Sequence, residues 1–362
     1  MDDAPTLPSL PEPEPEPAPL LEEGMLDVGD GQRLHYEVSG APDGVPALYL
    51  HGGPGGRLTS GYRRKAPAER CRIIGFSQRG AGLSTPSAAE EGVDLAVHTT
   101  AHLIADIERL REALGVEAWI VQGVSWGSTL AIAYAQAHPD RVLGIVLMAV
   151  TSTSRREVDW ITEDVGAIYP EAWDAFAAFA ERHGEFDRHD RSPGRVRIVE
   201  AYRRLLTCGD RDLEERAAAA WMAWEDEHIR IGTGDVRGPA RPAESLSEQE
   251  RRFALGFARL VTHYWAHDGF GPEGGLLSRM DRIGHLPGVL IHGRRDVSGP
   301  LVTAWELHRA WPASRLVVVE DEGHGGPRMV AAWRAAMEDF ARTLSASGTQ
   351  TGAEGTGRRA VG

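Results

Sequence analysis

Short apolar runs alternate with longer amphipathic segments along most of the chain. Runs rich in β-branched and aromatic residues predict strands, namely RLHYEV (33–38), ALYLHG (47–52), RIIGF (72–76), WIVQG (119–123), VLGIVLMAV (142–150), GVLIHG (288–293) and RLVVVE (315–320). Helical spacing of apolar residues predicts helices over 100–115, over 126–138 before Pro139, and from about 301 and 329. Strands that alternate with helices predict a mostly parallel sheet with helices on both faces.

The alternation stops between residues 151 and 283, where the sequence is mostly helical and rich in tryptophan. An insertion after the sixth strand of such a sheet lies over its C-terminal edge, where ligands bind, so residues 151–283 are predicted to form a helical cap. The α/β domain then comprises residues 23–150 and 284–344. Residues 1–22, rich in Pro and Glu, and residues 345–362, rich in Gly, Ser, Thr and Ala, are expected to be disordered tails.

Charge and composition exclude several classes of protein. The net charge of −14 argues against nucleic-acid binding, which needs basic patches, and agrees with a cationic ligand such as a free amino terminus. The two cysteines provide no disulfide framework, and no metal-ligand spacing or cofactor motif is present. The first residues have neither a basic nor an apolar run, and no window approaches the ~18 apolar residues of a membrane helix, so we expect a cytoplasmic protein without membrane contact.

The segment Gly123-Val124-Ser125-Trp126-Gly127 matches the pattern G-x-S-x-G. It follows a predicted strand and opens a predicted helix, which is the strand–turn–helix context that this pattern requires in α/β hydrolases. Glycines are needed there because the turn is strained and strand and helix pass close together. We therefore predict that Ser125 is the nucleophile of a serine hydrolase with the α/β-hydrolase fold.

A serine nucleophile needs a base and a carboxylate that orients the base, and in this fold they follow in the order Ser, Asp, His. Asp296 lies just past the strand GVLIHG, and His324 lies just past RLVVVE between glycines. Both loops follow C-terminal ends of strands, at the edge where Ser125 is expected. Asp321 and Glu322 are alternatives for the carboxylate, but they are too close in sequence to His324 to reach the far side of its ring.

A serine hydrolase also needs donors for the developing oxyanion. The backbone N–H of Trp126, directly after the nucleophile, is one candidate, and the loop His51-Gly52-Gly53-Pro54-Gly55-Gly56 provides Gly53 as the second. Glycine at 52 and 53 lets the backbone approach a substrate closely. A phosphate-binding loop would require a following Lys-Ser/Thr pair, which is missing.

At these residues the chain resembles the proline iminopeptidases, a branch of the α/β hydrolases. The resemblance extends over roughly residues 24–340 and rests on the segments LHGGPGG (50–56), SQRGAGLSTP (77–86), GVSWGSTLAIAYAQAHPDRV (123–142), HGRRDVSGP (292–300) and GHG (323–325). It implies an exopeptidase that releases N-terminal proline beneath a helical cap, with Ser125, Asp296 and His324 as its triad.

The cap departs from the family pattern. The resemblance implies that Glu225, in the pair Trp224-Glu225, binds the α-amino group of the substrate, and Trp224 beside it is expected to supply a wall of the substrate pocket. A second family glutamate is replaced by Val261, and Thr151 stands where the family has an aromatic residue in its proline pocket. In the segment SQRG, Ser77 replaces the usual Asp. These changes affect the substrate pocket and leave the triad intact.

Three functions remain open at this point. The first is an aminopeptidase that removes proline or another small residue from short peptides. The second is an esterase or amidase that acts on another small acyl substrate with the same triad. The third is a non-catalytic binding protein on a hydrolase scaffold, against which the complete triad argues. An Asp nucleophile, as in dehalogenases and epoxide hydrolases of this fold, is excluded by Ser125.

Overall fold

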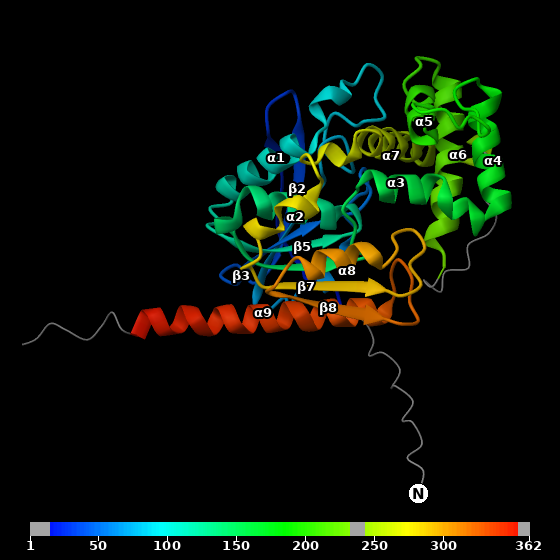
Figure 1. The fold of residues 1–362 in the computed structure, drawn as a ribbon. Coiled ribbons are helices and arrows are strands. Elements are labelled where there is room, and N and C mark those ends of the chain that lie inside the picture. The colour runs from blue at the N-terminus through cyan, green and yellow to red at the C-terminus, as the bar shows by residue number, and fades with distance from the viewer. Residues whose placement is uncertain (1–14, 232–242, 354–362) are drawn as a thin grey trace, which may run out of the picture.

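The computed structural model describes residues 15–231 and 243–353 (Figure 1). Within these residues, eight strands form one sheet in the order β1-β2-β4-β3-β5-β6-β7-β8. Their bounds are β1 Leu20–Asp27, β2 Arg33–Gly40, β3 Val45–Leu50, β4 Cys71–Phe76, β5 Trp119–Val124, β6 Val142–Met148, β7 Gly288–Gly293 and β8 Ser314–Val319. The strand β2 pairs antiparallel with β1 and β4, and the remaining pairs are parallel. The predicted mostly parallel sheet of an α/β-hydrolase fold is confirmed.

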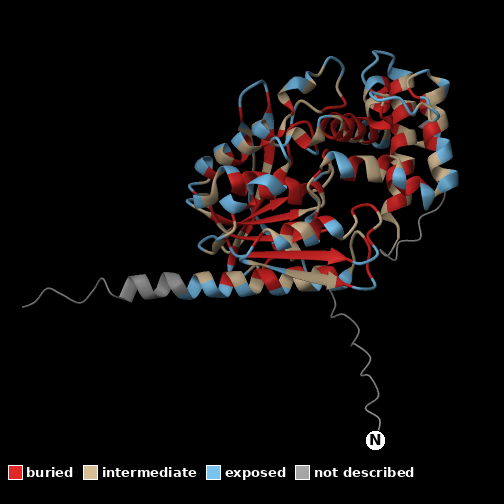
Figure 2. Ribbon diagram, viewed as in Figure 1, coloured by how far each residue is buried: buried red, intermediate tan, exposed pale blue. Residues whose placement is uncertain are grey.

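Helices cover both faces of the sheet, as Figure 1 shows. Helices α1 (Thr100–Ala113), α2 (Trp126–Ala137) and α8 (Val302–Arg309) contribute to one hydrophobic core, and α9 (Pro327–Ala353) contributes to the other. Along β3 the side chains alternate: Leu48 and Leu50 belong to the first core, whereas Ala47 and Tyr49 belong to the second. The central strands are therefore buried on both sides (Figure 2), which explains their continuous apolar sequence.

The tryptophan-rich insertion is helical. Its described residues include α3 (Arg155–Thr162), α4 (Pro170–Arg182), α5 (Ile198–Leu205), α6 (Arg211–Ile229) and α7 (Glu248–Ala266), and residues 232–242 of the predicted cap lie outside the described part of the chain. Phe176 stacks on Tyr202 with ring centres 4.4 Å apart and on Trp224 with ring centres 5.4 Å apart. These aromatic side chains extend the first hydrophobic core into the insertion, beside the C-terminal ends of the parallel strands.

Both ends of the ordered fold differ from the boundaries predicted from the sequence. Strand β1 begins at Leu20, so residues 20–22 belong to the sheet and not to a tail. Its side chains are mostly exposed and it is held by backbone pairing with β2, so its sequence lacks a strong apolar run. At the other end, α9 continues to Ala353 and thus includes residues 345–353 of the predicted tail. Residues 1–14 and 354–362 lie outside the described part of the chain.

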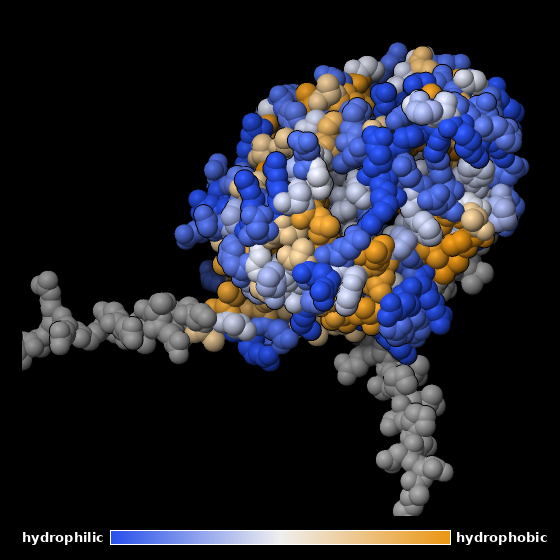
Figure 3. Space-filling view, viewed as in Figure 1, coloured by the Kyte–Doolittle hydropathy of each residue, from blue (hydrophilic) through white to orange (hydrophobic). Residues whose placement is uncertain are grey.

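The visible surface is mostly hydrophilic, with separate hydrophobic areas between the charged side chains (Figure 3). In the ranges 15–231 and 243–353, no helix is long and apolar enough to cross a membrane.

A buried ion pair fixes the loop after β4 next to the loop after β3. Arg79 donates through Nε and Nη2 to the two oxygens of Asp106, at 2.7 and 2.6 Å, and both side chains are fully buried. The neighbouring Gln78 donates its backbone N–H to His51 and its side-chain amide to the carbonyl of His51, each at 3.0 Å. The loop after β4 is therefore held by Arg79 to helix α1 and by Gln78 to the loop that carries the predicted oxyanion glycines.

We expect Asp106→Ala to lower the free energy of unfolding by about 3–5 kcal/mol, because it leaves the Arg79 guanidinium buried without its carboxylate. Asp339→Ala is the matched control, since Asp339 pairs with Arg342 on the surface and such pairs contribute about 0–1 kcal/mol. Urea denaturation of both variants measures the difference. Equal losses for the two variants would contradict a structural role of the buried pair.

Candidate active site

Ser125 lies at the turn between β5 and α2, where the backbone is strained. Its φ and ψ are 54° and −125°, a conformation that side-chain-bearing residues rarely adopt. A β-carbon on Gly123 would lie 2.2 Å from the carbonyl oxygen of Gly127, and one on Gly127 would lie 2.1 Å from the carbonyl oxygen of Leu50. The two glycines of the motif are therefore required by backbone contact, and the turn presents the Ser125 hydroxyl at the N-terminus of α2.

His324 and Asp296 complete a hydrogen-bonded chain that starts at Ser125. His324 Nε2 lies 3.1 Å from Ser125 Oγ, and His324 Nδ1 lies 2.8 Å from Asp296 Oδ2. The other carboxylate oxygen of Asp296 accepts the backbone N–H of Gly299 at 3.0 Å. The loops after β5, β7 and β8 thus bring the three side chains together at the C-terminal edge of the sheet, in the geometry of a nucleophile, a base and an orienting acid.

The two alternative carboxylates are engaged elsewhere. Asp321 pairs with Arg328 at 3.0 Å on the surface. Glu322 accepts the backbone N–H groups of Arg328 and Met329, at 2.7 and 2.8 Å, and so satisfies the first turn of α9. The structure therefore places Asp296 beside His324 Nδ1 and gives the other two carboxylates structural contacts.

The electrostatic surroundings favour a negatively charged Asp296 next to a protonated His324. Burial alone would raise the pKa of Asp296, but the charge and hydrogen bond of His324, the charge of His292 and the hydrogen bond from Gly299 outweigh it, and the pKa is lowered. Burial alone would lower the pKa of His324, but the charge and hydrogen bond of Asp296, with the charge of Glu225, outweigh it and raise the pKa. Asp296 is therefore ionised, and the site stabilises the imidazolium that forms when His324 takes a proton.

His292, which the sequence analysis did not single out, supports Asp296 from behind. The imidazole accepts the backbone N–H of Val150 at Nδ1 (3.0 Å), so Nε2 carries the proton and donates it to the carbonyl oxygen of Gly299 (2.7 Å). Burial lowers the pKa of His292, which keeps this ring neutral. The one sequence clue is a histidine at the end of a buried strand, four residues before the acid.

The glycine loop after β3 lies against the nucleophile. A β-carbon on Gly52 would lie 3.3 Å from the β-carbon of Ser125, and Gly53 has a φ of 123°. His51 Nε2 accepts the backbone N–H of Gln78, so Nδ1 carries the proton and donates it to the Gly52 carbonyl at 2.8 Å. Burial lowers the pKa of His51 to about 4, so the ring is neutral. These contacts hold the loop in one position, as preorganised oxyanion donors require.

A small cavity of about 50 Å³ opens beside Ser125. Its lining residues are Gly53, Ser125, Trp126, Thr151, Thr153, Glu157, Val158, Ile161, Trp265, Ser298, Gly299 and His324. The α/β domain thus provides Ser125, His324 and the two predicted oxyanion residues, Gly53 and Trp126. The insertion provides an apolar wall of Val158, Ile161 and Trp265, together with the carboxylate of Glu157, which accepts hydrogen bonds from the backbone N–H groups of Ser152 and Ser154.

The two predicted substrate-binding residues of the insertion, Trp224 and Glu225, are not among the residues that line this cavity. Trp224 donates its indole N–H to the carbonyl of Ile161 at 3.0 Å and packs in the aromatic core of the insertion, so it forms no wall of this cavity. Glu225 is also outside the lining; it is buried and accepts the indole N–H of Trp221 at 3.1 Å. Burial raises the pKa of Glu225 to about 7, against the opposing effects of the Trp221 hydrogen bond and the charge of His324.

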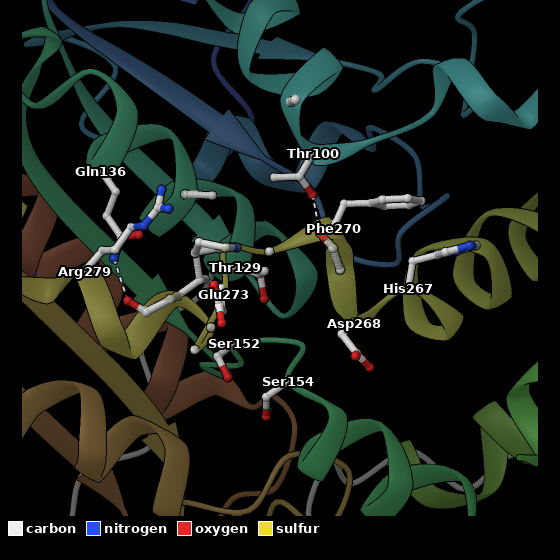
Figure 4. Close-up of a pocket in the computed structure, with 18 of the residues that line it drawn as sticks. Thr100, Thr129, Gln136, Ser152, Ser154, His267, Asp268, Phe270, Glu273 and Arg279 are labelled. Atoms are coloured by element: carbon white, nitrogen blue, oxygen red, sulfur yellow. Dashed lines mark hydrogen bonds between the residues drawn. The ribbon is translucent and has the colours of Figure 1, made fainter. Parts of the chain in front are cut away.

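A larger hollow of about 760 Å³ lies on the other side of the segment 151–154 (Figure 4). Ser152 and Ser154 line it on one side, and His267, Asp268 and Phe270 line it on another. Its lining includes none of the three triad side chains. The two hollows therefore differ in chemistry as well as in size, since only the smaller one is lined by the hydrogen-bonded pair Ser125 and His324. Among residues 15–231 and 243–353, no group of three or more His, Cys, Asp or Glu side chains is placed to hold a metal ion.

Comparisons with known proteins agree with this geometry. Residues 46–326 match the family model described as alpha/beta hydrolase fold. The chain is 43% identical to a probable proline iminopeptidase of Streptomyces coelicolor over 326 residues, which covers 89% of this chain and 95% of the relative. It is 40% identical to a proline iminopeptidase of Arabidopsis thaliana, with 83% and 74% coverage. A crystal structure of proline iminopeptidase from Mycobacterium smegmatis has a similar fold, with a TM-score of 0.57 at 19% identity, covering 89% of this chain and all of that one (100%).

We expect Asp296→Asn to lower kcat by about 10³–10⁴-fold, because an amide at this position favours the wrong tautomer of the His324 ring. The fold should persist, as thermal unfolding of the variant would show. Asp321→Asn is the matched control and should leave kcat within about twofold, since surface pairs contribute little. A severe loss in Asp321→Asn with a mild one in Asp296→Asn would reverse the assignment of the acid.

Proposed function

The chain belongs to the proline iminopeptidase family of α/β hydrolases, and from this premise we propose that it releases N-terminal proline, or another small N-terminal residue, from short peptides. The observation that carries the proposal is the hydrogen-bonded chain Ser125–His324–Asp296 beside a small cavity closed by the helical insertion. Relatives named proline iminopeptidases, 40% and 43% identical over most of the chain, support the substrate class.

The proposed reaction is acyl transfer through Ser125. His324 Nε2 takes the hydroxyl proton as Ser125 Oγ attacks the carbonyl carbon of the first residue, and Asp296 stabilises the imidazolium. The backbone N–H groups of Trp126 and Gly53 are the proposed donors to the oxyanion. His324 then gives its proton to the leaving amine of the shortened peptide. Water, activated by the same histidine, hydrolyses the acyl-enzyme and frees the first residue.

The shape of the cavity supports removal of a single residue. Val158, Ile161 and Trp265 of the insertion lie across from Ser125, so we propose that the insertion is a cap that blocks an extended chain on the N-terminal side of the scissile bond. The indole of Trp265 provides an apolar surface for a pyrrolidine ring. Thr151, which stands at the family's aromatic position, provides less apolar surface for that ring. The aromatic wall thus comes from α7 of the cap.

Glu225 is the proposed partner of the substrate's ammonium group. Its carboxylate is buried, and its charge contributes to the raised pKa of His324, which supports a position within electrostatic range of the reacting centre. A cation entering this dry region needs a carboxylate, because an unpaired buried charge is costly. With Val261 buried in place of a second carboxylate, binding should be weaker than with two acids, by about 1.5–3 kcal/mol for one charge-assisted hydrogen bond.

The alternative function is that of an esterase or amidase for another small acyl group. The observations that favour it are Val261 and Thr151, which remove a charge and an aromatic surface from the amine side of the pocket. Discrimination between proline and other small N-terminal residues should accordingly be poor, and esters without an amine should also be hydrolysed.

We expect Ser125→Ala to lower kcat on prolyl p-nitroanilide by about 10⁴-fold or more, because the triad acts as one unit. A fluorophosphonate probe should label the wild-type protein and leave the variant unlabelled in mass spectrometry of the intact chain. Ser192→Ala is a suitable control, since Ser192 is an exposed serine of the insertion. Labelling that persists in Ser125→Ala would exclude this serine as the nucleophile.

We expect Glu225→Gln to lower kcat/KM for prolyl and alanyl p-nitroanilides by about 10–100-fold, which corresponds to the loss of a charge-assisted hydrogen bond. Activity on N-acetyl-prolyl p-nitroanilide and on 4-nitrophenyl acetate, which lack the ammonium, should change little. Glu215→Gln is the matched control on the same helix, because Glu215 pairs with Arg211 at 2.7 Å near the surface. Equal rates for free and acetylated prolyl substrates, unchanged in Glu225→Gln, would favour the esterase or amidase function.

The pH dependence gives an independent measurement. Trp221, Asp226, His228 and His324 act on Glu225, and burial raises its pKa to about 7. Glu225 therefore becomes charged as the pH rises through about 7, whereas the substrate amine loses its proton above roughly pH 8. In the wild type, the ratio of kcat/KM for the prolyl substrate to kcat/KM for the acetate ester should be highest between about pH 7 and 8. In Glu225→Gln this ratio should no longer fall as the pH is lowered below about 7. Titration of His324 affects both substrates and cancels in the ratio.

A further inference from the structure

His228 connects the cap to the loop that carries the catalytic acid. It lies on α6 one turn after Glu225, with 1% of its surface exposed. Ser298, two residues after Asp296 and a wall of the cavity at Ser125, donates its hydroxyl proton to the carbonyl oxygen of His228 at 3.0 Å. Nδ1 of the His228 ring lies 3.0 Å from the same Ser298 oxygen.

These two contacts determine the tautomer of His228. A serine hydroxyl has one proton, and here the backbone carbonyl of His228 accepts it. The second contact must therefore be donated by the ring, so Nδ1 carries the proton and Nε2 does not. Burial, with the charge of His324 as the next cause, lowers the pKa of His228 to about 3, so the ring is neutral. His228 Nε2 is consequently a hydrogen-bond acceptor.

This acceptor faces another acceptor. His228 Nε2 lies 3.6 Å from Glu225 Oε2, and no hydrogen-bond partner of Nε2 occurs within the described ranges of the chain. A buried acceptor without a donor costs about 1–3 kcal/mol, and a lone pair directed at a carboxylate adds repulsion. A group with two N–H donors that bridges the two atoms from one side, at hydrogen-bond distance from each, would satisfy both at once.

We propose that His228 Nε2 and the Glu225 carboxylate together bind the protonated N-terminal amine of the substrate. The ammonium of an N-terminal proline is a secondary amine with two N–H bonds, one for each acceptor, and a primary ammonium can present two of its three N–H bonds in the same way. The inference rests on the proposed aminopeptidase function and adds a second amine-binding residue, on the same helix as Glu225, where Val261 provides no carboxylate.

The test uses two substitutions that separate the nitrogens of His228. An asparagine side chain places its amide near the position of Nδ1, so His228→Asn keeps a donor for Ser298 and removes the acceptor at Nε2. A glutamine side chain reaches the position of Nε2, so His228→Gln restores an acceptor there and loses the donor to Ser298. Both variants are compared with the wild type on prolyl p-nitroanilide, which has the ammonium, and on 4-nitrophenyl acetate, which lacks it.

We expect His228→Asn to raise KM for prolyl p-nitroanilide by about 10–100-fold, the equivalent of one hydrogen bond to a charged group, with a smaller change in kcat. Hydrolysis of 4-nitrophenyl acetate should stay within about twofold of the wild type, since the amide remains a neutral group of similar size. His228→Gln should recover most of the lost affinity for the prolyl substrate.

Three results would overturn the proposal. If His228→Asn affects the prolyl and acetate substrates equally, His228 acts only as a structural link to Ser298, and the same follows if His228→Gln is the more damaging variant. If Glu225→Gln weakens prolyl binding and His228→Asn does not, the amine is bound by Glu225 alone. If the wild type cleaves prolyl and N-acetyl-prolyl substrates equally well, the proposed aminopeptidase function fails, and the amine-binding pair fails with it.

Discussion

The close contact between strand β5 and helix α2 is the constraint on which the site depends. Gly127 lies so near the carbonyl of Leu50, and Gly123 so near Gly127, that neither position leaves room for a β-carbon. The short turn between them holds Ser125 at a positive φ, which costs about 1–3 kcal/mol and persists only because the surrounding sheet and helix are rigid. In return, the hydroxyl is fixed at a helix N-terminus, where its position does not depend on substrate.

The other reactive groups reach Ser125 because parallel strands end at the same edge of the sheet. Asp296 follows β7 and His324 follows β8, so strand register alone brings their loops together. Buried neutral histidines then fix the loops: His292 bonds to Val150 and Gly299 behind the acid, and His51 bonds to Gly52 beside the nucleophile. Burial lowers the pKa of both rings, so they add orientation without adding charge.

The sequence predicted the parts of the molecule that depend on local patterns. The apolar runs identified seven strands, and the motif around Ser125, with loops after two later strands, identified the three side chains that the structure brings together. Strand β1 was missed because backbone pairing, not apolar side chains, holds it. The orientation of Trp224 and the contacts of His228 depend on how helices pack, which no spacing along the chain specifies.

The site contains two acid–histidine pairs, Asp296–His324 and Glu225–His228, whose pKa values are shifted in opposite directions. Asp296 accepts hydrogen bonds from His324 and from Gly299, so its pKa is lowered and that of His324 is raised. Glu225 accepts one bond, from Trp221, so burial dominates: its pKa is raised, and that of His228 is lowered. Burial opposes ionisation of both carboxylates, and only at Asp296 do the charge of His324 and the added hydrogen bonds outweigh it. Asp296 is therefore ionised and able to stabilise a developing imidazolium, whereas Glu225 becomes charged only as the pH rises through about 7, and the proposed partner of that charge is the substrate ammonium.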